Sequence, residues 1–257
     1  MKRKIAIISI CAAAVLILVG AVMIFAANNS TPPSLSVKGK NLSFSDSVYI
    51  VYYVEAKDVD AENVKLLVWN SPKDSYTISD SPKKLSCLRT ETIDGKEYLR
   101  FEYRDLAAKN MTDTIYARAF TTSGSKDYYS DVTNYSVLQY AYNKLGKTGT
   151  ATTDASLKEF LVDMLEYGAA AQVEFEYKTD KLATADFKQI SVSGGVLSDQ
   201  CTRGLFLKNE TVTITATVPE GKTFSGWKNA AGTIVSTSPS YTVTVGDANA
   251  EYTAVFN

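Results

Sequence analysis

Apolar and hydroxyl side chains alternate along the last part of this sequence. The alternation is clearest in residues 212–218 (VTITATV) and returns in residues 241–245 and 251–256, with a turn at 219–221 leading into Phe-Ser-Gly-Trp at 224–227. Successive side chains of a β-strand point to opposite faces of the sheet, so each segment buries one face and leaves its Thr and Ser residues in water. The pattern therefore predicts a small β module built of short, half-buried strands.

Strand signals also fill the chain between residues 48 and 130. Asp94-Gly95 marks a tight hairpin turn, and after it Leu99, Phe101 and Tyr103 share one side of an alternating segment. Short strands separated by turns are typical of an antiparallel β-sandwich. The expected strands are 48–54, 63–69, 97–103, 114–120 and 126–130.

The hydrophobic period then changes to that of a helix. Residues 137–145 place their apolar side chains on one helical face, and Gly146 is positioned as the C-terminal cap. Ser156 and Glu159 fit a capping box for a second helix, whose apolar stripe runs from Leu157 to Gly168. We expect the two helices to form an αα-hairpin packed on the sandwich.

The fold class expected is therefore mainly β, in three parts. Residues 1–32 form a signal or anchor helix and linker, and residues 33–183 form the β-sandwich with its two helices. Residues 184–257 form the small C-terminal module. We expect that module to open with a hairpin over residues 190–197 that turns on Gly194-Gly195, because glycine pairs suit tight turns.

The N-terminus carries Lys2, Arg3 and Lys4, and residues 5–27 then contain no charge. A helix of that length reaches roughly 34 Å, which is enough to cross the hydrocarbon core of a bilayer. Basic residues before the apolar segment place the downstream chain outside the cell. We expect a single-pass transmembrane helix with the C-terminal part extracellular. The alternative is a signal peptide, after whose cleavage the protein is secreted.

The composition argues against several functions. The chain has no histidine, which removes the usual catalytic triads and most catalytic zinc sites. Its net charge of -1 offers no basic field for a phosphate backbone, so we expect no nucleic-acid partner. We expect no enzymatic activity, and we assign no catalytic, cofactor-binding or metal-binding residues.

Three sets of residues could form a metal, catalytic or ligand-binding site, and each could instead be part of an ordinary protein surface. Asp58, Asp60 and Glu62 hint at a calcium loop but lack the glycine and glutamate positions of an EF-hand, so a solvated turn is favoured. Carboxylates such as Glu102, Asp105 and Glu174 could serve a glycosidase, but nothing in the sequence pairs them.

Tyrosine is abundant, with 16 residues in the chain. Adjacent pairs at 52–53 and 128–129 should expose one ring each, because alternation points neighbours to opposite faces. Exposed rings recognise sugars and proteins, although an ordinary β surface also favours tyrosine. A further tyrosine cluster comprises Tyr135, Tyr140 and Tyr142.

Cys87 and Cys201 follow the apolar N-terminal segment and lie far apart in the sequence. A disulfide between them is possible in an oxidising compartment, and two unpaired, partly buried thiols are the simpler expectation.

The C-terminal module resembles the divergent internalin B-type repeat, also called the bacterial repeat domain, of Gram-positive surface proteins. Four segments carry the resemblance: Gly194-Gly195, VTITAT at 212–217, PEGKTFSGW at 219–227 and YTAVF at 252–256. The resemblance implies a small β-grasp-like fold with Trp227 in its core. Such repeats often occur in tandem, whereas this chain has one copy.

The first domain looks like an uncharacterised N-terminal region of clostridial surface proteins. The resemblance is carried by residues 63–69, 135–142 and 164–172. It implies a location at the cell surface and no particular activity.

Together these features predict a non-catalytic extracytoplasmic cell-surface protein with an adhesion or ligand-binding role. Its partner would be a surface protein or a glycan, with the membrane contacted through the N-terminal helix. Two alternatives stay open: an accessory or degenerate component of a polysaccharide-degrading system, and a structural spacer.

Overall fold

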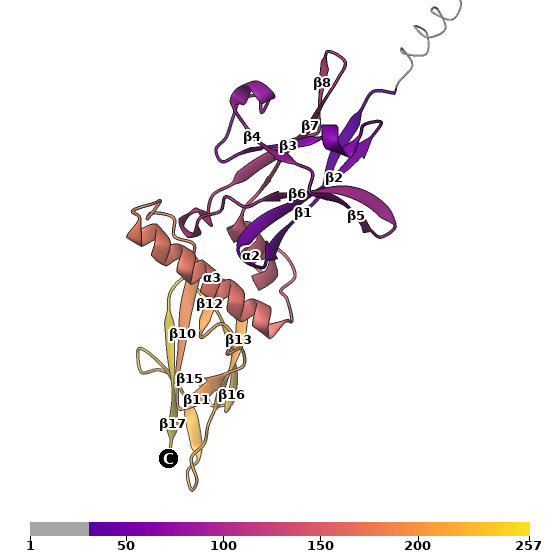
Figure 1. The fold of residues 1–257 in the computed structure, drawn as a ribbon. Helices are drawn as coiled ribbons and strands as arrows, with labels where there is room; N and C mark the ends of the chain where they lie inside the picture. The colour runs from indigo at the N-terminus through magenta and orange to yellow at the C-terminus, as the bar shows by residue number, and fades with distance from the viewer. Residues whose placement is uncertain (1–30) are drawn as a thin grey trace, which may run out of the picture.

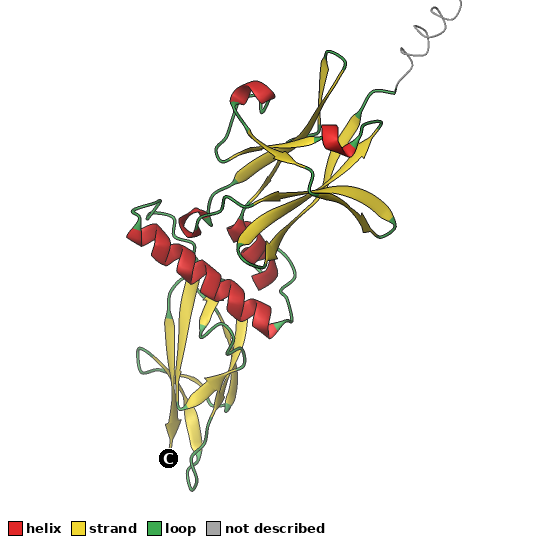
Figure 2. Cartoon of the chain, in the orientation of Figure 1, coloured by secondary structure: helices red, strands yellow, loops and turns green. Residues whose placement is uncertain are grey.

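The computed structural model describes residues 31–257 as a mainly β protein with antiparallel sheets and two α-helices (Figures 1 and 2). The predicted membrane or signal helix at residues 5–27 lies outside the described residues. Among residues 31–257, no helix combines the length and apolar character needed to cross a membrane.

The first sheet contains four antiparallel strands in the order β1-β2-β6-β5. Its β5–β6 hairpin turns at Asp94 and Gly95, whose φ angles of 50° and 75° match a turn with two left-handed residues. This confirms the predicted tight turn. The strands are β1 (Ser34–Phe44), β2 (Val48–Lys57), β5 (Arg89–Ile93) and β6 (Lys96–Tyr103).

The second sheet has the order β4-β3-β7-β8, and β9 pairs with β7 beyond the end of β8. Three short 3₁₀ helices interrupt the connections between strands. The strands are β3 (Lys65–Trp69), β4 (Lys83–Ser86), β7 (Ile115–Ser123), β8 (Lys126–Tyr129) and β9 (Thr133–Tyr135), and the 3₁₀ helices are η1 (Ala61–Asn63), η2 (Ile78–Asp80) and η3 (Ala108–Asn110).

The two sheets share one hydrophobic core. Tyr52 and Phe101 from the first sheet and Leu66 and Ala117 from the second are fully buried in the same cluster. Strand β6 contributes Leu99, Phe101 and Tyr103 to this core, which confirms the predicted inward face of residues 97–103. Burial of these side chains is the main favourable contribution to folding of this part.

Helix α2 (Val137–Leu145) begins after Ser136, whose hydroxyl accepts a hydrogen bond from the amide of Gln139, and ends at Gly146 with φ 97°. Both features match the expected helix and cap. Helix α3 (Ala155–Glu174) begins earlier than predicted, because Asp154 is its N-cap and accepts from the amide of Leu157 at 3.1 Å. The predicted capping box of Ser156 and Glu159 is therefore wrong, because the helix already begins at Ala155 and Ser156 lies within its first turn.

The C-terminal module consists of two sheets, and residues 187–257 contain no helix. Its first strand runs parallel to its last, β10 beside β17, within a five-stranded sheet of order β12-β10-β17-β14-β15. The second sheet has the order β11-β13-β16. The strands are β10 (Phe187–Ser193), β11 (Gly195–Leu197), β12 (Leu205–Leu207), β13 (Thr211–Ala216), β14 (Phe224–Asn229), β15 (Ile234–Ser236), β16 (Ser240–Thr244) and β17 (Ala250–Phe256).

Trp227 lies fully buried at the centre of this module, in one cluster with Ile190, Val212 and Ile214. Its indole nitrogen donates to the carbonyl of Pro239 at 3.3 Å, so the polar atom of the ring is satisfied inside the core. Trp227 is therefore a structural residue.

The predicted hairpin over residues 190–197 is wrong. Strands β10 and β11 do not pair with each other; β10 pairs with β12 and β17, while β11 pairs with β13. Gly194, with φ 74°, turns the chain from one sheet into the other. A Cβ atom on Gly195 would lie 2.5 Å from the carbonyl oxygen of Thr215 and 2.6 Å from Trp227 Cη2, so this position needs glycine for close approach.

Helix α3 lies between the first pair of sheets and the C-terminal module (Figure 1). Leu161 and Leu165 of α3 are buried in the core of the first two sheets, and Phe187 and Leu207 of the module belong to the same cluster. The apolar core therefore continues from the first sheets into the start of the module.

The two cysteines within residues 31–257, Cys87 and Cys201, are unpaired and partly buried. This is the simpler of the two expectations. Burial raises the pKa of the Cys87 thiol.

Candidate functional site

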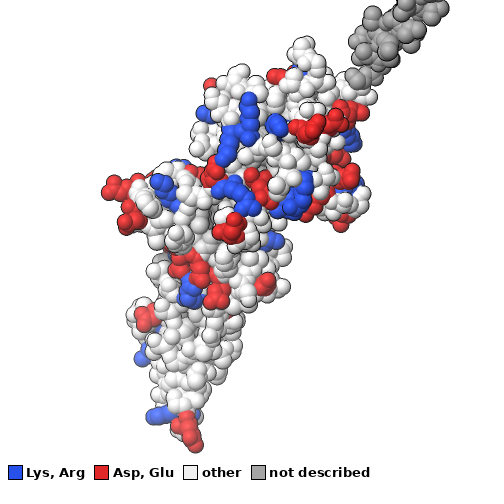
Figure 3. All heavy atoms as spheres, in the orientation of Figure 1, with Lys and Arg blue, Asp and Glu red and all other residues white. Residues whose placement is uncertain are grey.

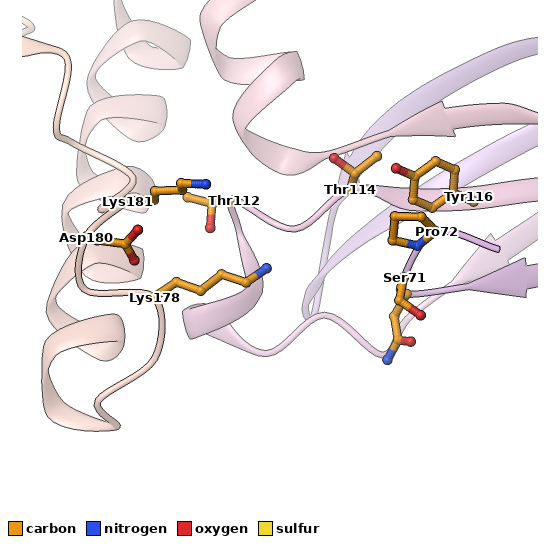
Figure 4. A pocket seen from close by; sticks show the side chains of 9 residues that line it. Ser71, Pro72, Thr112, Thr114, Tyr116, Lys178, Asp180 and Lys181 are labelled. Atoms are coloured by element: carbon orange, nitrogen blue, oxygen red, sulfur yellow. The ribbon is translucent and has the colours of Figure 1, made fainter.

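A polar pocket opens where three loops meet, and we call it the loop pocket (Figure 4). It has a volume of about 460 Å³ and is lined by residues 70–72 after β3, residues 112, 114 and 116 at the start of β7, and residues 178, 180 and 181 after α3. Figure 4 shows Lys178, Asp180 and Lys181 on one side and Pro72 and Tyr116 across the opening. These segments are distant in sequence, so only the tertiary structure brings them together.

The buried side-chain amide of Gln172 fixes the loop after α3 by hydrogen bonds to its backbone. Gln172 is fully buried, and its Nε2 donates to the carbonyl of Lys181 at 3.0 Å and lies 3.4 Å from that of Lys178. Its Oε1 accepts from the amide of Ala183 at 2.9 Å. A buried amide that satisfies several backbone groups fixes the path of the segment it contacts.

Asp113 fixes the position of Lys178 at the rim of the pocket. The buried carboxylate of Asp113 accepts from Lys178 Nζ at 2.7 Å and from the hydroxyl of Tyr177 at 2.6 Å. The amide of Asn110 donates to the same carboxylate at 2.8 Å. The pKa of Lys178 is raised because its ammonium group donates to Asp113.

The opposite side of the pocket is held by an aromatic cluster on the outer face of the second sheet. Trp69 is buried, and its indole nitrogen donates to the carbonyl of Asp80 at 3.2 Å. The ring of Tyr76 lies 5.4 Å from Trp69 and 5.2 Å from Tyr116, centroid to centroid. Tyr116 therefore belongs to this aromatic cluster and also lines the pocket.

A second hollow, of about 440 Å³, lies between the loop after α2 and residues 208–211 of the module. Lys147 and Lys158 line it together with Glu210. Burial raises the pKa of Glu210, whose carboxylate accepts a hydrogen bond from the amide of Leu207. This hollow belongs to the junction between α3 and the module.

The carboxylates considered for glycoside hydrolysis lie on different elements. Glu102 pairs with Arg100 at 2.9 Å and with Arg104 at 2.8 Å. Burial opposes its ionisation, but hydrogen bonds from both arginines outweigh that effect, so its pKa is lowered. Asp105 pairs with Lys83, and Glu174 is the exposed last residue of α3.

Asp58, Asp60 and Glu62 lie in and beside the turn between β2 and η1. Within residues 31–257, no three Asp, Glu, Cys or His side chains lie close enough together to share a metal ion. In this part of the chain the three residues form a turn at the surface.

The tyrosines do not form an exposed row. Tyr52 is fully buried, and its hydroxyl has no hydrogen-bond partner among the described residues. Tyr53, Tyr128 and Tyr129 are each half-buried, so one ring of the first pair and both rings of the second are partly exposed. Their rings carry stacked cations, such as Arg118 over Tyr129 at 4.5 Å, which cover part of the aromatic face.

Sequence reasoning missed every residue of the loop pocket. The segment Asn70-Ser71-Pro72 reads as an ordinary turn after a strand, and residues 178–181 read as a polar linker. No local signal distinguishes these residues from other surface loops, because the pocket depends on the packing of α3 against η3.

Comparison with known proteins supports the assignment of the module. No curated protein and no solved structure matched the chain. The resemblance of the first domain to clostridial surface proteins stays a prediction. Residues 188–257 match the family of the divergent InlB B-repeat domain, as their sequence pattern implied.

Proposed function

We propose that this protein is a non-catalytic, extracytoplasmic cell-surface protein that binds a surface protein or a glycan. The observation that carries the proposal is the match of residues 188–257 to a bacterial surface-type repeat domain, which fits a cell-surface protein. The apolar segment at residues 5–27 supports a single membrane anchor, or a signal peptide that is removed after export.

In this proposal the two parts outside the membrane have different tasks. Residues 33–183, a β-sandwich with an αα-hairpin, present the ligand-binding surface, and residues 184–257 form a repeat module of two β-sheets. Figure 3 shows that the charged side chains gather over the first sheets and around α3, while much of the module is uncharged on this face. The loop pocket lies in the charged and polar part.

Two other functions make different predictions. An accessory component of a polysaccharide-degrading system would bind the polysaccharide together with a catalytic partner. A structural spacer would bind neither glycans nor proteins.

The location can be tested on intact cells of the source organism. An antibody against residues 31–257 should label unpermeabilised cells, and external protease should remove the signal. Labelling that requires permeabilisation would exclude the cell-surface assignment.

The binding role can be tested with the purified full chain in mild detergent. The chain should bind members of a glycan array or a panel of purified surface proteins, and it should release no reducing ends from polysaccharides over long incubation. Turnover of a polysaccharide would overturn the non-catalytic assignment. Failure to bind any member of either panel would favour the spacer.

A further inference from the structure

We infer that the loop pocket binds the end of a neutral saccharide chain. The inference rests on the proposed ligand-binding function and assigns to it a ligand class and a place. Five properties of the pocket support it: its size, its polar residues, its charges of both signs, its apolar side and its anchored walls.

The size and lining suit a compact polar ligand. The volume of about 460 Å³ falls within the range of small-molecule sites. Ser71, Thr112 and Thr114 supply hydroxyls, and Asn70 supplies an amide, so each group can both donate and accept. A saccharide carries hydroxyls of the same dual character. An apolar ligand would instead leave these groups without partners, which is costly.

The charge of the pocket favours a neutral ligand over an anion. Lys178 is already paired with the buried Asp113 at 2.7 Å. Lys181 lines the same wall as Asp180, so this wall carries charges of both signs. A phosphate or uronate group would therefore meet the carboxylate of Asp180 as well as the ammonium group of Lys181.

Tyr116 and Pro72 provide the apolar side that a sugar ring needs. Figure 4 shows both residues on the side of the pocket opposite Lys178, Asp180 and Lys181. A pyranose ring has one face of C–H groups that packs on an aromatic ring while its hydroxyls reach the polar wall. The ring of Tyr76, whose centroid lies 5.2 Å from that of Tyr116, packs against the Tyr116 ring.

Two of the pocket's walls are anchored by hydrogen bonds of neighbouring residues. Gln172 holds the loop after α3, and Trp69 holds the segment that leads into Asn70 through its bond to Asp80. A preformed site loses less conformational entropy on binding than a mobile one. The affinity of a saccharide, whose hydroxyl groups each bind weakly, depends on such a preformed site.

The test uses the full chain in mild detergent and four trisaccharides as probes. Cellotriose, mannotriose and the N-acetylglucosamine trimer are neutral, and trigalacturonate is the anionic comparison. Binding is followed by isothermal titration calorimetry. We expect at least one neutral trisaccharide to bind more tightly than trigalacturonate.

Variants locate the site. Thr114→Val removes one hydroxyl and Asn70→Ala removes the amide, and each should weaken binding about three- to tenfold, as expected for one lost hydrogen bond. Thr92→Val on β5 and Asn134→Ala on β9 are matched exposed controls and should stay within about twofold. The melting temperature of each variant shows whether it remains folded.

The outcomes separate the pocket from the wider function. Neutral saccharide binding that is unchanged in Thr114→Val and Asn70→Ala would overturn the pocket assignment and leave the proposed function standing. Tighter binding of trigalacturonate would overturn the neutral-ligand assignment. Binding to a surface protein with no saccharide bound would overturn this inference alone, and binding to nothing would overturn both.

Discussion

Lys158 of α3 and Asp199 of the C-terminal module form an ion pair with an Nζ–Oδ2 distance of 2.6 Å. Arg203 of the module pairs with Asp163 and Glu166 of the same helix. These polar contacts flank an apolar contact, because Leu207 of the module is buried in the core that α3 shares with the first sheets. The helix is therefore packed on both sides.

Leu207→Ala should destabilise the whole chain. Leu207 is 1% exposed, and truncating a buried leucine leaves a cavity that costs about 2–5 kcal/mol. We expect one cooperative thermal transition, followed by circular dichroism, at a lower temperature. Val218→Ala, at a position 44% exposed, is the control and should change the midpoint little. A separate early transition of the module alone would contradict a shared core.

Arg203→Gln should have a much smaller effect, although Arg203 makes two ion pairs. Its side chain is 44% exposed, so solvent screens both pairs and they contribute little to stability. Urea unfolding should show midpoints that differ slightly at low salt and converge at high salt. A loss as large as that of Leu207→Ala would mean that the ion pairs, rather than the apolar contact, hold the junction.

Gly195→Ala should destabilise the module through a steric clash. The new Cβ would meet the backbone oxygen of Thr215 and the ring of the buried Trp227, and forced overpacking costs about 1–3 kcal/mol. Gly246→Ala is the matched control, since no atom lies within 4 Å of a Cβ there. Tryptophan fluorescence during unfolding reports the difference, and equal midpoints for the two variants would refute the close approach at Gly195.

Gln172→Leu should loosen the loop after α3. It removes the acceptor of the Ala183 amide and the donor to the Lys181 carbonyl, and unsatisfied buried groups cost about 1–3 kcal/mol. Hydrogen exchange of the Ala183 amide should become faster. Gln139→Leu on α2 serves as the control. Unchanged exchange at Ala183 would show that other contacts hold the loop.

Glu210→Gln should stabilise the protein at neutral pH. Burial raises the pKa of Glu210 in the folded state, so the protonated carboxyl group favours the folded protein. This contribution to the free energy of unfolding is fully present below the unfolded pKa of about 4.3 and is lost as the pH rises through the folded pKa. The glutamine keeps an acceptor for the Leu207 amide and carries no charge. Melting temperatures should be higher for the variant at pH 7 and similar for both proteins near pH 3. An equal difference at both pH values would contradict this cause.

A chain beginning at residue 31 should be soluble and rich in β structure. Strands β1 to β17 and helices α2 and α3 lie within residues 31–257 and share buried cores there. Far-ultraviolet circular dichroism and size-exclusion chromatography provide the check. Aggregation of this chain would contradict the view that residues 5–27 serve only as an anchor or signal.

Much of the secondary structure could be predicted because its signals are local. Alternation identified β6, β13 and β17, Asp94-Gly95 identified one hairpin, and Gly146 identified the end of α2. Each of these signals depends on residues a few positions apart, whose side-chain direction and φ preference act within the segment itself.

The pairing of strands and the loop pocket were decided only by the tertiary structure. Gly194-Gly195 has the composition of a hairpin turn, yet the chain crosses there into another sheet, because β10 pairs with β12 and β17 while β11 pairs with β13. The loop pocket joins residues near 70, 114 and 180, which meet because α3 packs against η3 and the residues that lead into β7. The sequence alone determined the position of both helices and of several strands, and that the last segments build a repeat module. Long-range packing decided their partners, since the burial of one shared core depends on residues that no local pattern relates.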